Sequence, residues 1–213
     1  MTASVLLNNI SIISAIFPVI AAVKNRLYLN DVLKIAAAFF VLSAMFDLLL
    51  VLVMQFGLSN NAPILHLFIA LSTCFFTWIY FVAFYSPALK KITVILGAIT
   101  LIVVLFNAVG GDGIFAYPSI SNTAESIYLI ILALLYFYQL LTRQEFIHIE
   151  KQALFWINSG VLIYFSVNIF LFMLFSRILT EHIQNFWVIH SVSNLIANLL
   201  YAIGLLCRPQ KTT

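Results

Sequence analysis

Charged side chains are scarce in this chain: Asp, Glu, Lys and Arg together make up 8% of its 213 residues. A soluble domain carries roughly 25% charged residues, because its surface must face water. Here 64% of the residues are hydrophobic and the mean hydropathy is +1.12. A chain of this length cannot hide so much apolar surface in its own interior, so we expect its solvent to be lipid.

Cysteine is nearly absent as well, with Cys74 inside one apolar stretch and Cys207 at the end of another. Two such cysteines provide no disulfide framework and no metal-binding spacing. The net charge is +3, but the basic residues are scattered over the ends of apolar stretches rather than gathered into a patch. We therefore expect no binding to nucleic acid.

Positive charge is missing from the beginning of the chain. Residues 1–18 contain no Lys or Arg, and Lys24 and Arg26 follow the first apolar stretch. A secretory signal peptide has its positive charge before the apolar region and a small-residue cleavage site after it. The first stretch therefore predicts a membrane span that is retained.

The chain does contain seven apolar stretches, each near the 20 or so residues that a spanning helix needs. Only helices and closed barrels satisfy their backbone hydrogen bonds in hydrocarbon, and these stretches are about twice the length of barrel strands. We predict an all-α, polytopic membrane protein in which residues 1–213 form a single seven-helix transmembrane domain. The predicted spans are about 4–23, 34–55, 62–84, 91–109, 119–141, 153–176 and 186–207.

The basic residues predict how the spans are oriented. Of the ten, nine fall on one side of the predicted membrane and one on the other. Because cytoplasmic loops carry the excess of Lys and Arg, we expect the N-terminus outside the cytoplasm and the C-terminus inside. The nine are Lys24, Arg26, Lys34, Lys90, Lys91, Arg143, Lys151, Arg208 and Lys211, and the tenth is Arg177.

Polar and small side chains recur at steps of three and four residues in several spans, which places each set on one helix face. Such residues mediate helix contacts in lipid, so we expect these stripes to face inward and to serve mainly as packing contacts. Two examples are His66, Ala70, Thr73, Thr77 and Tyr80, and Thr93, Gly97, Thr100, Val104 and Asn107.

Ionisable side chains inside the spans give the sharpest functional signal, since each costs on the order of 2.5–3.5 kcal/mol at the bilayer centre. At about 1.5 Å of rise per residue, five polar groups from five spans fall at one level of the outer half. We predict an outward-facing ligand cavity there, to which Ser43 and Asn194 also contribute; the alternative is that each group reaches the headgroups independently. The five are Asp47, His66, Glu125, Asn168 and His190.

Retinal proteins are one seven-helix class that can be compared with these residues. They need a lysine in the middle of a span to form the Schiff base. Every lysine in this chain lies at the end of a span or in a loop. The sequence therefore excludes retinal, and we expect no other cofactor.

Membrane ceramidase-like hydrolases resemble this chain in topology and in the pair Ser43 and Asp47. They hold zinc through several histidines, including a His-x-x-x-His pair, but here Asn194 follows His190 at that spacing. Zinc needs three protein ligands, and only His66, His190 and Asp47 or Glu125 could supply them. We expect no metal and no catalytic residues, with a zinc-dependent lipid hydrolase as an alternative.

Sugar and vitamin transporters of the three-plus-one-plus-three type share the seven-span plan with the N-terminus outside. Their halves are parallel repeats with helix-breaking residues at equivalent places. Pro18 interrupts the first span, but the fifth has no internal proline. A small-solute transporter of the seven-helix type is a further alternative.

Four segments resemble an uncharacterised family of small bacterial seven-helix membrane proteins. Residues 155–168 (FWINSGVLIYFSVN) resemble a recurrent motif of that family, residues 187–191 and 198–204 resemble its last span, and residues 60–66 fit its third. The resemblance implies a multi-pass protein of the bacterial inner membrane and an association with sensor histidine kinases. It implies no catalytic or binding residues.

Taken together, these observations predict a receptor-like or sensory membrane protein that binds a small or lipidic ligand, rather than an enzyme. The predicted loops are about ten residues long and the tail about six, which leaves no room for an output domain. Besides the lipid bilayer, we therefore expect a membrane or cytoplasmic signalling protein as a partner.

Overall fold

The computed structural model describes residues 3–57, 60–111, 113–142, 149–174 and 183–208, and within these ranges it contains helices and no strand. Seven helical segments are long and apolar enough to cross a membrane, as the sequence predicts. Two short 3-10 helices, η1 (Arg26–Tyr28) and η2 (Ile149–Lys151), precede α3 and α7. The α-helices are α1 (Ala3–Ser14), α2 (Ile16–Lys24), α3 (Asp31–Gln55), α4 (Ala62–Ala83), α5 (Pro87–Val109), α6 (Ser119–Thr142), α7 (Ala153–Leu174) and α8 (Ile183–Leu206).

The first span is built from two helices, α1 and α2, with a break at Ala15. Pro18 explains the break, because its ring has no N–H to donate to the carbonyl of Ser14 and clashes with it. Ala15 instead donates its N–H to the Ile12 carbonyl at 3.2 Å, a tighter turn. The interruption expected at Pro18 is therefore confirmed.

Two helices begin earlier than the apolar stretches do. The Asn30 side chain accepts a hydrogen bond from the Leu33 N–H at 3.0 Å and caps α3 three residues before the predicted start. Pro87 lies in the first turn of α5, where a missing N–H costs nothing, so that helix begins before Lys90 and Lys91. Hydropathy misses these turns because they lie at helix ends and carry charged side chains, Asp31 and Lys34 in one and Lys90 and Lys91 in the other.

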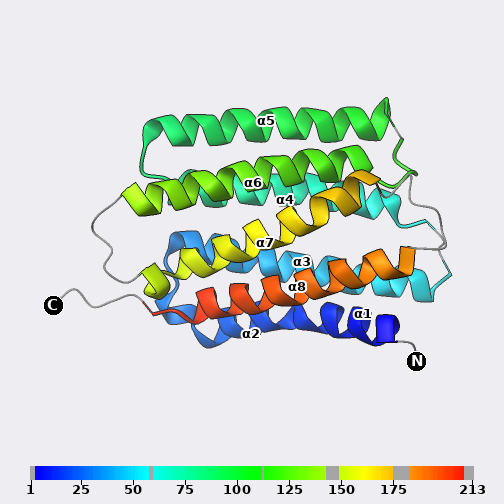
Figure 1. Ribbon diagram of the computed structural model, residues 1–213, viewed down its shortest axis with the longest axis horizontal. Coiled ribbons are helices and arrows are strands. Elements are labelled where there is room, and N and C mark those ends of the chain that lie inside the picture. The colour runs from blue at the N-terminus through cyan, green and yellow to red at the C-terminus, as the bar shows by residue number, and fades with distance from the viewer. Residues whose placement is uncertain (1–2, 58–59, 112, 143–148, 175–182, 209–213) are drawn as a thin grey trace.

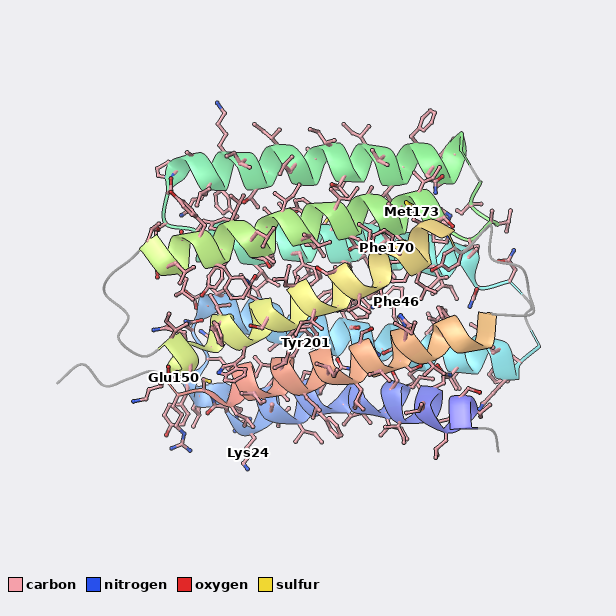
Figure 2. The ribbon with its side chains drawn as sticks, in the orientation of Figure 1. Lys24, Phe46, Glu150, Phe170, Met173 and Tyr201 are labelled. Carbon is pink, nitrogen blue, oxygen red and sulfur yellow. The ribbon has the colours of Figure 1, made fainter. Side chains whose placement is uncertain are left out.

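The helices run side by side along the long axis of the molecule (Figure 1). We call the end at which α1 begins the N-terminal end and the opposite one, at which α8 finishes, the C-terminal end. The turns from α2 to α3 and from α4 to α5 lie at the C-terminal end. Figure 2 shows Lys24 and Glu150 toward that end, and Phe170 and Met173 toward the other. The Lys and Arg residues within the described ranges also belong to the C-terminal end: Lys24, Arg26, Lys34, Lys90, Lys91, Lys151 and Arg208.

Six of the seven spans form a ring, and the remaining one, α5, packs outside it. Around the ring, α1 and α2 contact α8, which is followed by α7, α6, α4 and α3, and α3 returns to α2. The helix outside the ring is α5, which packs on α4 and α6. Its polar stripe is buried against these two helices, as expected for packing contacts.

Glycines allow some of these helices to approach closely. A Cβ atom at Gly97 would lie 2.5 Å from the Thr77 hydroxyl oxygen, and one at Gly204 would lie 2.6 Å from the Ala153 carbonyl oxygen. Small residues at such crossings are the usual means of helix association in lipid. The close α4–α5 and α7–α8 contacts therefore depend on glycine, which has no side-chain carbon, at Gly97 and Gly204.

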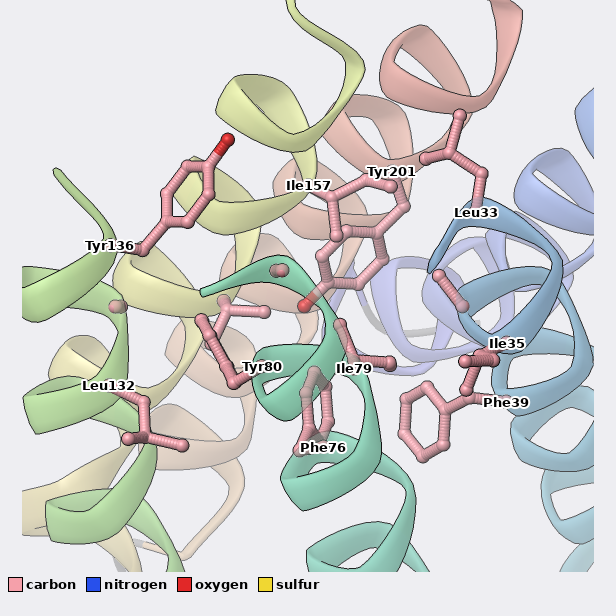
Figure 3. Packing of buried hydrophobic residues seen from close by; sticks show 14 of the residues in the cluster. Leu33, Ile35, Phe39, Phe76, Ile79, Tyr80, Leu132, Tyr136, Ile157 and Tyr201 are labelled. Atoms are coloured by element: carbon pink, nitrogen blue, oxygen red, sulfur yellow. The ribbon is translucent and has the colours of Figure 1, made fainter. Parts of the chain in front are cut away.

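A layer of aromatic side chains fills the middle of the ring. The rings of Phe39 and Phe76 lie 4.6 Å apart, and those of Phe40 and Tyr201 stack at 4.5 Å. Figure 3 shows Phe39 and Phe76 side by side between their helices. On the C-terminal side of this layer, the Tyr80 hydroxyl donates a hydrogen bond to the Asn158 side chain. This bond is buried between α4 and α7. The middle of the ring is thus closed by packed side chains.

Candidate functional site

A partly enclosed cavity of about 130 Å³ lies between the aromatic layer and the N-terminal end of the bundle, and we call it the upper cavity. Side chains of α3, α4, α6, α7 and α8 form its wall. Its polar lining residues are Ser43, Asp47, Ser72, Asn122, Glu125, His190, Asn194 and Asn198. Its aromatic lining residues are Phe39, Phe40, Phe68, Phe76, Tyr164, Phe165, Phe172 and Tyr201.

Two carboxylates reach this cavity from helices on different sides of it. Glu125 of α6 is 3% exposed, and one of its oxygens, Oε1, has no hydrogen-bond partner among the described residues. The Ser72 side chain lies near the carboxyl group of Glu125. Asp47 of α3 is half-buried, and no hydrogen bond joins it to Ser43 one turn earlier on the same helix. Within the described ranges, neither carboxylate has a basic partner.

His190 is held in place by side chains behind it. Asn168 donates its Nδ2 to the Tyr164 carbonyl and to the Ser193 hydroxyl, both at 2.7 Å, so its Oδ1 is left to accept from His190 Nδ1 at 3.0 Å. Because Nδ1 is the donor in this bond, the neutral imidazole keeps Nε2 as an acceptor. Trp187 stacks on the same ring at 4.8 Å.

The two asparagines of α8 connect the cavity wall to the first span. Asn194 Nδ2 donates to the Ser11 hydroxyl, and Asn198 Nδ2 donates to the Ser14 hydroxyl, each at 2.9 Å. Both bonds join α8 to α1 in the interior of the bundle. They consume donors of both amides, so the asparagines are structural as well as cavity-lining.

Five of the seven predicted site residues line the cavity: Ser43, Asp47, Glu125, His190 and Asn194. Asn168 lies behind His190 as its support. His66 lies elsewhere, in the first two turns of α4, where its Nε2 is 3.3 Å from the Ala116 carbonyl oxygen. The depth of His66 along its span is similar to that of Glu125, but its helix face is directed to the connection before α6.

The position of His66 bears on the hydrolase alternative. Among the described residues, no three His, Cys, Asp or Glu side chains come close enough together to hold a metal ion. The conceivable ligand set of His66, His190 and Asp47 is therefore not assembled, since His66 belongs to a different part of the bundle.

Several lining residues were not predicted from the sequence. Ser72 and Phe76 of α4 face the cavity, whereas the stripe identified in that span, including Thr73 and Thr77, packs toward α5 and α6. The helix α4 contacts three neighbours and so has more than one buried face. Asn122 offered a signal, because it precedes Glu125 by three residues and shares its face.

Of the other cavities between described residues, two continue this one toward the C-terminal end. One of about 140 Å³ lies near the ends of α4 and α6 and includes the polar side chains of Gln139 and Gln152. Between it and the upper cavity is a space of about 10 Å³, scarcely enough for one water. Phe76 lines both this small space and the upper cavity, and Tyr136 lines both this small space and the cavity of about 140 Å³. The three cavities are thus arranged in a row, interrupted by packed side chains.

No known protein family, curated protein or solved structure matches this chain. The cavity and the distribution of charge along the bundle are therefore the features that bear on function.

Proposed function

We propose that this chain is a receptor-like membrane protein that binds a small or lipidic ligand in the upper cavity and signals its occupancy through a partner protein. The observation that supports the proposal is the convergence of Asp47, Glu125 and His190 on one space within the bundle. Each of these groups is costly to keep in a membrane, and ionisable residues retained there generally serve binding or transfer. Because three of these groups line one cavity, we infer that they are retained to bind a ligand there.

The orientation that we propose places the N-terminal end of the bundle outside the cytoplasm. The described Lys and Arg residues lie at the C-terminal end, and the positive-inside rule assigns that end to the cytoplasm. Arg143, Arg177 and Lys211, which the sequence also assigns to sides, lie outside the described residues. In this orientation, of a bacterial inner membrane, the cavity is accessible to ligands from the outer side.

A route for the signal is offered by α8. Tyr201 lines the cavity and stacks on Phe40, and the last turn of the same helix is tied to the end of α2. There Asn25 Nδ2 donates to the Leu205 carbonyl at 2.8 Å and to the Cys207 carbonyl at 3.2 Å. A ligand that displaces Tyr201 therefore acts on a helix whose far end lies at the proposed cytoplasmic surface.

Two measurements test this proposal. Native mass spectrometry of the gently extracted protein should detect a small molecule bound to the wild-type chain and absent from the double variant Asp47→Asn/Glu125→Gln. A photo-crosslinking amino acid at Ser86, which is exposed at the C-terminal end, should capture one defined partner in cells. The same amino acid at Phe115, at the opposite end, is the matched control and should not capture it. Absence of both the bound molecule and the partner would contradict a receptor function.

A small-solute transporter is the second candidate, favoured by the row of three cavities. In that case the Phe76 ring and the bond between Tyr80 and Asn158 form the barrier that must open for passage. Proteoliposomes that contain the chain alone should then accumulate the molecule that co-purifies with it. A receptor should bind the molecule without accumulating it, so this measurement separates the two functions.

A further inference from the structure

We infer that the ligand of the upper cavity is a small organic cation, an ammonium group carried on a compact apolar body. The inference rests on the proposed function, since it specifies the chemical class of ligand for that same cavity. Its support comes from the charge of the wall, the rings around it and the size of the space.

The charge of the wall favours a cation. Asp47 and Glu125 both line the cavity, and none of the described residues in its lining is a Lys or an Arg. Elsewhere in the described ranges the carboxylate of Asp31 pairs with Lys34 at 3.1 Å, but Asp47 and Glu125 have no such partner. An anionic ligand would meet two carboxylates in a medium of low dielectric, where like charges repel strongly.

Glu125 supplies the observation that points to a missing partner. Its side chain is 3% exposed, and Oε1 lies in the interior with no hydrogen bond from a described residue. Buried polar oxygens are nearly always hydrogen-bonded, and an unsatisfied one is costly. An ammonium N–H in the cavity would satisfy this oxygen. His190 adds a second acceptor, because its Nδ1 is committed to Asn168 and Nε2 remains available.

Aromatic rings complete the recognition of an ammonium group. Eight Phe and Tyr side chains line the cavity. The face of an aromatic ring attracts a cation within about 6 Å, and cages of such rings bind quaternary ammonium ligands. Tyr164 and Phe172 lie 5.7 and 6.1 Å from the His190 ring, so acceptors and rings occur at the same part of the wall.

The volume limits the size of the ligand. The cavity holds about 130 Å³, close to the roughly 150 Å³ that accommodates one benzene molecule in an engineered protein core. A single ring with an aminomethyl group or a trimethylammonium head fits this limit. The ammonium group could belong to a free amine or to the headgroup of a choline or ethanolamine lipid. All three carry the positive charge, and the free amine and ethanolamine groups also supply N–H donors.

The test compares four probes on the purified full chain in detergent. Benzylammonium and tetramethylammonium carry the cation, benzyl alcohol is a neutral analogue, and benzoate is an anionic one. We expect isothermal titration to show that benzylammonium binds at least tenfold more tightly than benzyl alcohol and that benzoate does not bind. Tenfold corresponds to about 1.4 kcal/mol, a modest value for a buried charge interaction.

Substitutions in the cavity wall test whether its carboxylates cause the tighter binding of benzylammonium. Glu125→Gln should lose the tenfold advantage of benzylammonium over benzyl alcohol, while Asp31→Asn, the same change at an exposed pair, should keep it. Asp47→Asn serves as a second variant if Glu125→Gln fails to fold. To separate the two sources, binding is repeated in nanodiscs: competition by phosphatidylcholine or phosphatidylethanolamine, but not by phosphatidylglycerol, would identify a lipid headgroup, and no competition a free amine.

Equal binding of benzyl alcohol, preferential binding of benzoate, or no binding of either cation to the folded protein would overturn the assignment. Each of these results leaves the receptor proposal standing if native mass spectrometry still detects a bound molecule. Conversely, binding of a cation to the purified chain, together with failure of the Ser86 crosslink to capture a partner in cells, would support the ligand class and count against signalling.

Discussion

Asp47 and Glu125 reach the same cavity under different constraints. Glu125 is enclosed by α6 and its neighbours and lies near Ser72, whereas Asp47 lies on a part of α3 where the packing is loose. The buried residues of α3 all precede Val41, so its second half has no buried side chain. Asp47 therefore contributes little to the packing of the bundle, and its removal should be tolerated by the fold.

The substitution Asp47→Leu should abolish ligand binding and leave the amount of folded protein in the membrane unchanged or higher. The reason is that a carboxylate inside a span carries an insertion cost of about 2.5–3.5 kcal/mol, which leucine removes. Native mass spectrometry measures the bound molecule, and fluorescence-detected gel filtration measures the folded protein. Met45→Leu, on the exposed face of the same helix, is the control. Full ligand occupancy in Asp47→Leu would remove this residue from the site.

Asn168 is expected to behave in the opposite way, because its role is structural. Asn168→Leu removes the bonds to His190 and Ser193 and should destabilise the protein by about 1–3 kcal/mol, since buried polar groups lose their partner. Thermal unfolding in detergent provides the measurement. Asn9→Leu, the same change at an exposed position of α1, should leave the midpoint unchanged. An equal midpoint for Asn168→Leu and wild type would show that the network adds no stability.

For single residues, the sequence could predict how far along its helix a side chain lies, but not which neighbouring helix or cavity the side chain faces. A count of residues placed His66 and Glu125 at similar levels, yet only Glu125 faces the cavity. Ser72 was overlooked because Thr73 and Thr77 gave the more visible stripe. Ser72 and Thr73 differ by about 100° around α4, and the neighbouring helices that decide which face is used are not encoded locally.

At the scale of helices, contact is set by where small residues allow close approach. On α8, Gly204 packs against Ala153 and Ile157 of α7, with Gly160 of α7 under the ring of Tyr201. These glycines alternate between the two helices, so both backbones contribute to the crossing. The α7–α8 pair is therefore the most sensitive to added side-chain volume.

The change Gly204→Val should destabilise the bundle by about 1–3 kcal/mol through overpacking. Its Cβ would lie 2.6 Å from the Ala153 carbonyl oxygen, which is backbone and cannot rotate away. The midpoint of thermal unfolding should fall by several degrees. For comparison, Gly110→Ala introduces a Cβ no closer than 3.4 Å to any neighbour and should have little effect. Similar midpoints for the two variants would mean that α7 and α8 are not held together at this crossing.

The number of spans was predictable because hydrophobic length is a local property of the sequence. The seven predicted stretches correspond to the seven helical segments that are long and apolar enough to cross a membrane, with differences of up to four residues where their ends are described. The arrangement was not predictable. Nothing in the pattern of α5 distinguishes it from the ring helices, yet it packs on α4 and α6 outside the ring.

For the whole molecule, charge asymmetry predicts an orientation that accessibility can test. In a Cys74→Ser/Cys207→Ser background, Phe115→Cys and Ser86→Cys place single exposed thiols at the N-terminal and C-terminal ends. A membrane-impermeant maleimide added to cells whose outer membrane has been permeabilised should label Phe115→Cys at once. Ser86→Cys should react only after the inner membrane is opened with detergent, because the proposed orientation places this Lys- and Arg-bearing end in the cytoplasm. The reverse pattern would turn the cavity toward the cytoplasm, and the ligand would then have to come from inside the cell.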